Sequence, residues 1–158
     1  MAGPKIIESD SQAGDWRIAI VASRYNRDIG ERLLAGCLRT LTGRGIRAER
    51  ITVVRVPGAF EIPLAVKTVA ESRTADAVVA LGAVVRGETP HFDFIAAECA
   101  RGVAAVAVAT GVPVSFGVLT VDTIDQALDR SGDDESNKGS EAAAAALEMA
   151  GLMRNLAQ

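Results

Sequence analysis

Aromatic residues are scarce in this sequence. They make up 4% of the 158 residues, whereas hydrophobic residues as a whole make up 49%. A core must therefore be built from Ala, Val, Leu and Ile, a composition that favours β-branched residues in buried strands and Ala and Leu on helices. Long apolar runs are also missing, because residues 102–118 and 142–153 are short or broken by Gly, Pro or charge. We therefore expect an α/β protein with no membrane span.

Residues that bind metals are also few. His91 is the only histidine, and Cys37 and Cys99 lie far apart without CxxC spacing. We expect no metal site and two reduced core cysteines, as in cytosolic proteins. Residues 1–15 contain no apolar segment typical of a secretory signal, which also favours a cytoplasmic protein. The net charge of −3 offers no clustered positive surface for nucleic acid or an anionic membrane.

The hydrophobic pattern predicts strands that alternate with helices. This alternation implies a four-stranded parallel sheet with helices on both faces, a three-layer α/β sandwich. Residues 1–15 lack periodicity, so we expect a flexible N-terminal arm followed by one domain over residues 16–158. Strands are expected at 16–22, 49–56, 76–81 and 113–119, and helices at 27–42, 60–72, 90–109, 123–130 and 140–156.

Capping residues predict several element boundaries. Thr89 is expected to cap the helix at 90–109, with Pro90 at its first position, where no amide donor is needed. Asp122 is expected to open the helix at 123–130. The segments 82–89 and 131–138 are expected to be loops.

Open parallel sheets bind ligands beyond the carboxyl ends of their strands. The predicted ends are residues 22–25, 56–61, 81–91 and 119–120. His91 lies there in the first turn of a helix, and imidazole is the side chain best suited to proton transfer near neutral pH. This position favours a catalytic histidine, and the alternative is a surface histidine that helps to close a helix end.

Gly87, Glu88 and Thr89 directly precede that helix. Backbone amides and the positive end of a helix dipole attract phosphate, and Thr89 adds a hydroxyl donor. The alternative is an ordinary capped loop. We expect Glu88 to contribute only its backbone, with its carboxylate turned outward. Neither a Walker A motif nor GxGxxG is present, which argues against a nucleotide site.

The segment PGAFEIP at residues 57–63 is unusual. Its Pro-Gly pair shapes a tight exit from a strand, Ala59 and Phe60 would present backbone groups, and Glu61 could accept hydrogen bonds from hydroxyl or ring N–H groups. The alternative is a strand-to-helix turn with Glu61 in the positive first turn. Tyr25 has two interpretations as well, stacking on a planar heterocycle or half-buried packing.

Arg130 and Lys138 bracket a polar loop. Arginine suits bidentate phosphate recognition, but a basic residue at the end of a short helix is also an ordinary dipole partner. The acidic residues 133–135 favour a solvated loop tip, because loops that bind hard cations need a longer ligand pattern. Phe116 is expected to be a core residue of its strand unless it lines the site of a neighbouring subunit.

Five segments lie in one register from about Trp16 to the C-terminus: SRYN (23–26), PGAFEIP (57–63), LGAVVRGETPHFDFI (81–95), FGVLTVDTIDQALDR (116–130) and NKG (137–139). Together they resemble the lumazine synthase family. The resemblance implies a flavodoxin-like fold and the condensation of 5-amino-6-(D-ribitylamino)uracil with 3,4-dihydroxy-2-butanone 4-phosphate. The product would be 6,7-dimethyl-8-ribityllumazine, with loss of phosphate and water and with no metal or organic cofactor.

The resemblance also implies a role for each site residue. His91 would be the acid–base residue, and Arg130 and Lys138 would join it in catalysis. The phosphate would be held by Gly87, Glu88, Thr89 and Arg130. The pyrimidine and ribityl chain would be held by Tyr25, Ala59, Phe60, Glu61, Ala83, Val84, Val85 and Phe116. Three of these residues match positions that come from an adjacent subunit: Phe116, Arg130 and Lys138.

The sequence departs from the family pattern at three places. Tyr25 stands where the family usually has Phe or Trp, which keeps an aromatic ring and adds a hydroxyl to the site. Pro90 stands where a second Thr is common, which stiffens the loop. The loop at residues 133–135 is acidic where relatives often have small or basic residues. None of these changes removes a residue expected to be catalytic.

The resemblance predicts a cyclic pentamer as the smallest active unit. The segment 130–138 shows no insertion relative to relatives that form a hollow icosahedral shell of twelve pentamers, so we expect the shell. The arm at residues 1–15 could pair with the sheet edge of a neighbour. The sequence leaves open whether the shell houses a riboflavin synthase partner.

Two other function classes remain open. One is a related pteridine enzyme that dismutates the lumazine to riboflavin. The other is a flavin-binding or container protein without activity. The complete set of His91, Arg130 and Lys138 favours the synthase over both.

Overall fold

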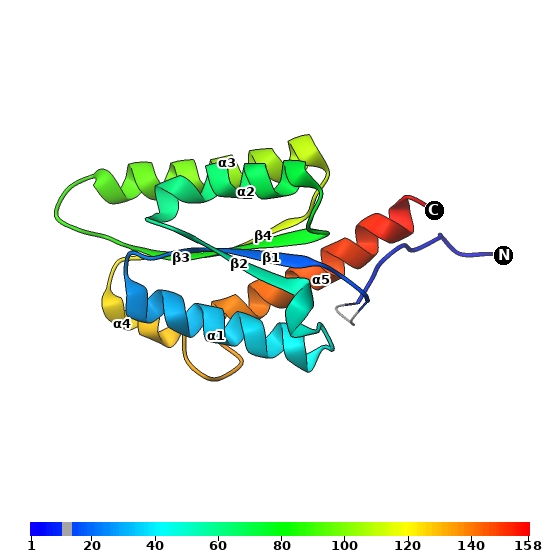
Figure 1. Ribbon diagram of the computed structural model, residues 1–158, viewed down its shortest axis with the longest axis horizontal. Helices are drawn as coiled ribbons and strands as arrows, with labels where there is room; N and C mark the ends of the chain where they lie inside the picture. The colour runs from blue at the N-terminus through cyan, green and yellow to red at the C-terminus, as the bar shows by residue number, and fades with distance from the viewer. Residues whose placement is uncertain (11–13) are drawn as a thin grey trace.

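A single parallel sheet forms the centre of the protein. The computed structural model describes residues 1–10 and 14–158. The sheet lies between two helical layers in Figure 1, and its strands follow the order β2-β1-β3-β4 with every neighbouring pair parallel. The strands are β1 (Ile18–Ser23), β2 (Ile51–Val56), β3 (Ala77–Val85) and β4 (Val114–Val121).

Helices cover both faces of the sheet. α2 and α3 lie on one face, and α1, α4 and α5 lie on the other (Figure 1). This arrangement confirms the predicted three-layer sandwich, which is consistent with a flavodoxin-like fold. The α-helices are α1 (Arg27–Gly43), α2 (Ile62–Ser72), α3 (His91–Thr110), α4 (Ile124–Asp129) and α5 (Lys138–Leu156), and the 3-10 turns are η1 (Ala48–Arg50) and η2 (Ala59–Glu61).

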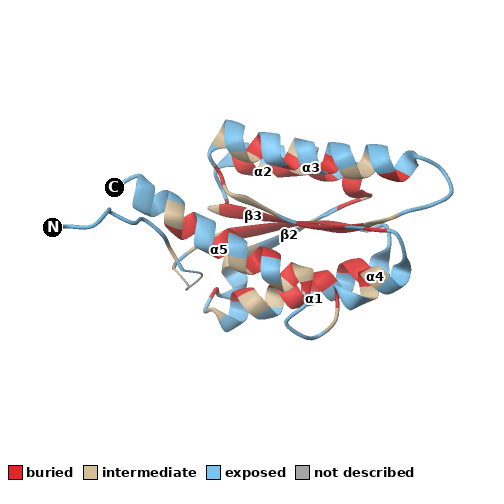
Figure 2. Ribbon diagram, turned by 180° about the vertical axis from the view of Figure 1, so that it is seen from behind, coloured by how far each residue is buried: buried red, intermediate tan, exposed pale blue. Residues whose placement is uncertain are grey.

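The strand β1 shows how the sequence builds the core. All six of its residues are buried, because it lies inside the sheet with helices on both sides. Ile18 and Ile20 pack toward α1 and α5, whereas Ala19 and Val21 pack toward α2 and α3. Figure 2 shows the buried residues concentrated in the strands and on the helix faces turned toward them. Each large aliphatic side chain buried in this way contributes about 1.5–3 kcal/mol.

The predicted loop at residues 82–89 is wrong in its first half. Residues 82–85 continue β3 and pair with β4 from Gly82 opposite Val118 to Val85 opposite Val121. The glycine signals a loop in sequence, yet here it lies in a strand because it pairs with β4, and a side chain at this position would overlap the Ser23 hydroxyl. Smaller differences occur where η1 and η2 replace the ends of the predicted elements at 49–56 and 60–72.

Two predicted helix starts are also corrected. Pro90 occupies the cap position of α3 rather than its first turn, and Thr89 is not the cap. Thr123 rather than Asp122 caps α4, because its Oγ1 accepts a hydrogen bond from the Gln126 amide at 3.2 Å. Each cap lies one residue after the predicted one. Hydrophobic periodicity does not fix a helix boundary to one residue, so the capping geometry decides it.

α5 begins two residues before the predicted start at 140. Asn137 caps it, since its Oδ1 accepts hydrogen bonds from the amides of Gly139 at 2.8 Å and Ser140 at 3.1 Å. Lys138 therefore belongs to the first turn of the helix, and only residues 131–137 of the predicted loop lie between α4 and α5.

The described part of the N-terminal segment lies beside the end of α5 (Figure 1). The Glu8 carbonyl accepts a hydrogen bond from Asn155 Nδ2 at 3.1 Å, and a side chain at Gly151 would overlap the Ser9 hydroxyl. The Arg154 guanidinium lies 4.4 Å from the centroid of the Trp16 ring. Residues 1–10 contain no helix or strand, and residues 11–13 of the predicted arm lie outside the described residues.

Two expectations about the chain as a whole are tested directly. Cys37 and Cys99 are both free and buried, as expected of core thiols. Across residues 1–10 and 14–158, no helix has the length and apolarity needed to cross a membrane.

Candidate active site

The connections of the sheet reverse direction between β1 and β3. These two strands are neighbours, and the helices that follow them, α1 and α3, lie on opposite faces of the sheet. In open α/β sheets this reversal leaves the space where ligands bind. Three of the predicted segments reach the carboxyl edge of the sheet: Tyr25 after β1, η2 after β2, and residues 81–91, which contain the end of β3 and the turn that leads to His91. The fourth, residues 119–120, lies within β4.

Tyr25 is held by its backbone and presents its ring to solvent. The amides of Arg24 and Tyr25 donate to the Pro57 carbonyl at 3.1 and 3.0 Å, which joins the exits of β1 and β2. The ring lies against Gly58, where a Cβ would come within 2.6 Å of Tyr25 Cδ2, so a residue without a side chain is required there. The side chain is 66% exposed, which leaves the ring available to stack on a planar ligand.

Glu61 closes the turn at η2. Its Oε2 accepts a hydrogen bond from the Gly58 amide at 3.0 Å, so this oxygen serves the local fold. Ala59 is buried beneath the turn, whereas Phe60 is 58% exposed beside it. The turn-forming interpretation therefore holds for one Glu61 oxygen, and the exposed Phe60 is available for a ligand.

His91 is the first residue of α3 and is exposed to solvent. Its backbone amide makes a long hydrogen bond, 3.4 Å, to Thr89 Oγ1. Residues 86–90 before it are exposed as well, and a side chain at Gly87 would meet open space. This turn thus presents backbone amides, a hydroxyl and an imidazole at the positive end of a 20-residue helix.

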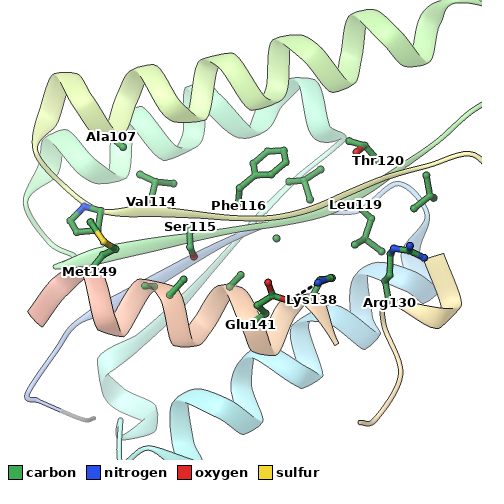
Figure 3. A pocket seen from close by; sticks show the side chains of 17 residues that line it. Ala107, Val114, Ser115, Phe116, Leu119, Thr120, Arg130, Lys138, Glu141 and Met149 are labelled. Atoms are coloured by element: carbon green, nitrogen blue, oxygen red, sulfur yellow. Dashed lines mark hydrogen bonds and ion pairs between the residues drawn. The ribbon is translucent and has the colours of Figure 1, made fainter. Parts of the chain in front are cut away.

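A second group of predicted residues lines a cavity of about 490 Å³ along β4 and α5. Figure 3 shows Phe116 above the strand, on the side of α3, and Arg130 and Lys138 below it, on the side of α5. Phe116 is 41% exposed, so the expectation that it is a core residue is wrong for the single chain. The cause is its place on β4, which is one of the two edge strands of the sheet.

Arg130 and Lys138 lie close together in this cavity. The Lys138 amide donates to the Arg130 carbonyl at 2.8 Å, and Arg130 Nη1 donates to the Gln126 carbonyl at 3.0 Å. The Lys138 ammonium lies 2.6 Å from Glu141 Oε2. Both side chains therefore line the same cavity, Arg130 held by a carbonyl of α4 and Lys138 paired with a carboxylate of α5.

The single chain does not bring the two groups of residues into one cavity. Among the described residues, the lining of the β4–α5 cavity includes Phe116, Arg130 and Lys138 but neither His91 nor Tyr25. His91 begins a helix on one face of the sheet, and Arg130 follows a helix on the other.

Three residues of this region escaped the sequence analysis. Asn26 Nδ2 donates to the Ala83 carbonyl at 2.9 Å and ties the exit of β1 to β3, with the backbone of Asn26 in the left-handed region at φ 58°. Asn137 is buried and caps α5. Hydrogen bonds from Arg86 to Asp122 and Asp93 raise the pKa of the Arg86 guanidinium. Their place inside three of the family segments, 23–26 for Asn26, 81–95 for Arg86 and 137–139 for Asn137, is the signal that could have indicated them.

The acidic loop at residues 133–135 is tied to its surroundings rather than grouped around a cation. Asp133 pairs with Arg39 at 3.3 Å. Hydrogen bonds from the Ser136 hydroxyl and amide lower the pKa of Asp134. Over residues 1–10 and 14–158, no three His, Cys, Asp or Glu side chains are grouped so as to hold a metal ion.

The fold places the chain among open parallel α/β proteins, a class in which ligands commonly bind at the carboxyl edge of the sheet. The chain belongs to the 6,7-dimethyl-8-ribityllumazine synthase family, whose model matches residues 15–154. It is 54% identical over 142 residues to the 6,7-dimethyl-8-ribityllumazine synthase of Halorhodospira halophila (strain DSM 244 / SL1), which covers 90% of this chain and 91% of the relative. The resemblance seen in the motifs is thereby confirmed, and the family is one of transferases.

Proposed function

We propose that this chain carries out the reaction of its family in an active site shared between two copies of the chain. The reaction condenses 5-amino-6-(D-ribitylamino)uracil with 3,4-dihydroxy-2-butanone 4-phosphate to give 6,7-dimethyl-8-ribityllumazine. Phosphate and water are released, and the product is the precursor of riboflavin. The observation that carries the shared site is the separation of His91 from Phe116, Arg130 and Lys138 within one chain.

One copy would supply the carboxyl edge of the sheet at β1 and β3. The exposed rings of Tyr25 and Phe60 offer stacking surfaces for the pyrimidine, and Glu61 and the end of β3 (Ala83, Val84 and Val85) offer polar backbone and carboxylate groups for the ribityl chain. The turn at Gly87, Glu88 and Thr89 would hold the phosphate through its amides.

The adjacent copy would supply the end of its β4–α5 cavity. Arg130 would reach the same phosphate, and Lys138 would add a second positive charge beside it. Phe116 would cover the pyrimidine from the other side. An aromatic side chain exposed on an edge strand is then accounted for, since the neighbour buries it.

The chemistry requires few groups from the protein. An aromatic diamine and a ketone phosphate react readily when held together, so positioning supplies much of the acceleration. His91 would move protons during formation of the Schiff base and elimination of phosphate. Its exposure at the start of α3 leaves the side chain accessible for this role.

The assembly we propose is a cyclic pentamer, with twelve pentamers forming a hollow shell. A ring fits a site that joins two different surfaces of the same chain, because such head-to-tail contacts close by rotation. Residues 1–15 would act as an arm beside the domain at 16–158 and pair with the sheet edge of a neighbour. We further propose a cytoplasmic location, which fits two free thiols, and riboflavin synthase as a partner inside the shell.

Mixed oligomers test the shared site. His91→Ala and Arg130→Ala chains are each expected to have low activity in lumazine formation, followed by fluorescence after both substrates are added. Co-assembled in equal amounts, they should form intact sites at about a quarter of the interfaces of a randomly mixed ring. Recovery of activity above the sum of the separate variants supports the shared site. Absence of recovery from a correctly assembled mixture would show that each chain carries a complete site.

A further inference from the structure

Arg86 connects three parts of the carboxyl edge. Its Nε donates to Asp122 Oδ1 at 2.8 Å and its Nη1 to Asp93 Oδ1 at 3.2 Å. The guanidinium carbon lies 4.3 Å from the centroid of the Phe92 ring, and the backbone amide donates to the Val121 carbonyl at 2.9 Å. One planar side chain at the end of β3 thus contacts both the start of α3 and the turn after β4.

The contacts on α3 fix the turn that carries His91. Phe92 and Asp93 are the next two residues of the helix, and the Phe92 ring is 9% exposed. Arg86 covers this ring from outside and holds the Asp93 carboxylate at the same time. A displacement of this turn would carry the imidazole of His91 with it.

The contact with Asp122 leads to Arg130. The Asp122 amide donates to Gln126 Oε1 at 2.8 Å, and the Gln126 carbonyl accepts from Arg130 Nη1 at 3.0 Å. The path from Arg86 through Asp122 and Gln126 to Arg130 is therefore continuous within one chain. α4 has only six residues, so its orientation depends on these end contacts more than on its length.

We propose that Arg86 is a positioning residue for two active sites at once. It aligns His91 in the site of its own subunit and Arg130 in the site that this subunit completes for its neighbour. This inference rests on the proposed shared site. A displacement of about 1 Å in a positioned group is enough to slow a reaction by up to about 100-fold.

The contacts of Arg86 are suited to positioning rather than to stability. The Arg86, Asp93 and Asp122 side chains are 44%, 60% and 64% exposed. Ion pairs this exposed contribute little to the free energy of unfolding, because water screens them. Replacing Arg86 is therefore expected to change kinetic constants while leaving Tm almost unchanged, and a merely structural role predicts a fall in Tm with the kinetic constants of the folded enzyme intact.

The experiment places Arg86→Met on one side of the shared site at a time. Methionine keeps an apolar cover on Phe92 and removes the donors. In a mixed oligomer of His91→Ala and Arg130→Ala chains, Arg86→Met on the His91→Ala chain disturbs only the Arg130 that this chain presents. On the Arg130→Ala chain it disturbs only His91. We expect the first placement to raise KM for the butanone phosphate and the second to lower kcat, each by about tenfold or more.

A matched control and two further variants complete the design. Arg101→Met removes an arginine that pairs with Glu98 on the same helix, α3, and should change neither constant. Asp122→Asn should reproduce the first placement and Asp93→Asn the second, each in an assembly of unchanged mass. These two variants decide the question if Arg86→Met fails to assemble.

The outcomes separate the two proposals. If the unmodified mixture recovers activity but neither placement of Arg86→Met lowers it, the role of Arg86 is refuted. A loss in only one placement refutes the joint role. If the mixture recovers nothing, the shared site fails instead, and Arg86→Met in the otherwise unchanged chain then tests Arg86 alone, where unchanged kcat and KM would contradict positioning.

Discussion

At the scale of single residues, the proposed chemistry depends on side chains that the fold leaves exposed. Tyr25, Phe60 and His91 are all open to solvent, although the backbone amide of Tyr25 donates to the Pro57 carbonyl and that of His91 to the Thr89 hydroxyl. The charged residues proposed for the site are also held by local contacts. Glu61 accepts a hydrogen bond from the Gly58 amide, and Lys138 pairs with Glu141. Exposure of functional groups on a fixed backbone allows a neighbour or a ligand to complete their surroundings.

Substitution of His91 and Arg130 should have unequal effects. His91→Ala is expected to slow turnover by about 10²–10⁴-fold at most, because it removes proton transfer and leaves substrate positioning intact. Arg130→Ala should be more damaging, since it removes the side chain that anchors the phosphate. Steady-state kinetics of lumazine formation measures both. Unchanged KM for the butanone phosphate and unchanged turnover in Arg130→Ala would refute the role of Arg130.

The two thiols should be unreactive in the folded protein. Burial raises the pKa of Cys37 to about 12 and that of Cys99 to about 11, so almost no thiolate is present at neutral pH. We expect neither to react with a thiol reagent within minutes at pH 8, and both to react once guanidinium unfolds the chain. Rapid labelling of the native protein would contradict this prediction.

At the scale of elements, helix ends determine where the proposed site residues lie. Arg130 and Lys138 are brought together because α4 ends and α5 begins at opposite ends of one loop. Asn137 fixes that loop from inside: its Nδ2 donates to the carbonyls of Arg32 at 3.2 Å and Gly132 at 2.8 Å. It also lies against Gly36 of α1, where any side chain would overlap it. Packing of α5 on α1 and the position of Lys138 thus depend on one buried amide.

Asn137→Ala should therefore destabilise the protein and lower its activity together. The variant loses the cap of α5 and leaves two partly buried carbonyls without the Asn137 donor, which we expect to cost about 2–4 kcal/mol. Urea unfolding measures the loss at a fixed protein concentration. Asn137→Asp keeps the capping acceptor but replaces the donors by a buried carboxylate that faces two carbonyl oxygens, so it should also be destabilised although the cap remains. An Ala variant as stable as the native protein would show that the cap is dispensable.

At the scale of the whole molecule, one chain is half of an active site under our proposal. The edge strand β4 carries the exposed Phe116 and a cavity that extends along α5, and these features require a second surface to cover them. Tyr25 and His91, at the carboxyl edge of the sheet, lie outside this cavity. Catalysis and assembly are therefore expected to depend on each other.

Native mass spectrometry should find a multiple of five copies of the 16.4 kDa chain. Sixty copies would support the shell, and five the isolated ring. Activity per chain should fall on dilution once the ring dissociates, because the shared site is then lost. A monomer with full activity would contradict both the assembly and the shared site.

Stability of the whole molecule should depend on pH through an ion pair at the opposite edge of the sheet. Burial acts to raise the pKa of Asp76, but hydrogen bonds from the Arg17 side chain and backbone, together with nearby arginine charges, lower it overall. Arg17 Nη2 lies 2.9 Å from Asp76 Oδ1. A carboxyl with a lowered pKa stabilises the fold above its unfolded pKa of about 3.9 and loses this contribution as the pH falls further.

Asp76→Asn tests this pair. It should reduce the free energy of unfolding by about 1–3 kcal/mol at pH 7, because the hydrogen bonds lose their charge. The difference from the native protein should shrink as the pH falls below about 4, where the native carboxyl becomes protonated as well. Urea unfolding at pH 7 and at pH 3 measures both values. An equal difference at the two pH values would exclude the ion pair as its cause.

The sequence by itself determined the layered fold and the family. Alternating strands and helices predicted the parallel sheet, since β-branched runs and helical periodicity are local patterns that each element satisfies by itself. The motifs determined the family, because five segments in one register match together. The starts of α4 and α5 were missed by one and two residues. Several polar residues near each start can act as the cap, and the hydrogen bonds of the folded chain select Thr123 and Asn137.

The tertiary structure decided the features that depend on strand pairing and on contacts between distant segments. Gly82 lies in a strand because β4 pairs with it, and Phe116 is exposed because β4 lies at the edge of the sheet. The contacts of Arg86 with Asp93 and Asp122 also arise only after folding, since they join segments up to 36 residues apart. Such contacts between distant segments follow from the path of the chain in space, and no local pattern of residues encodes them.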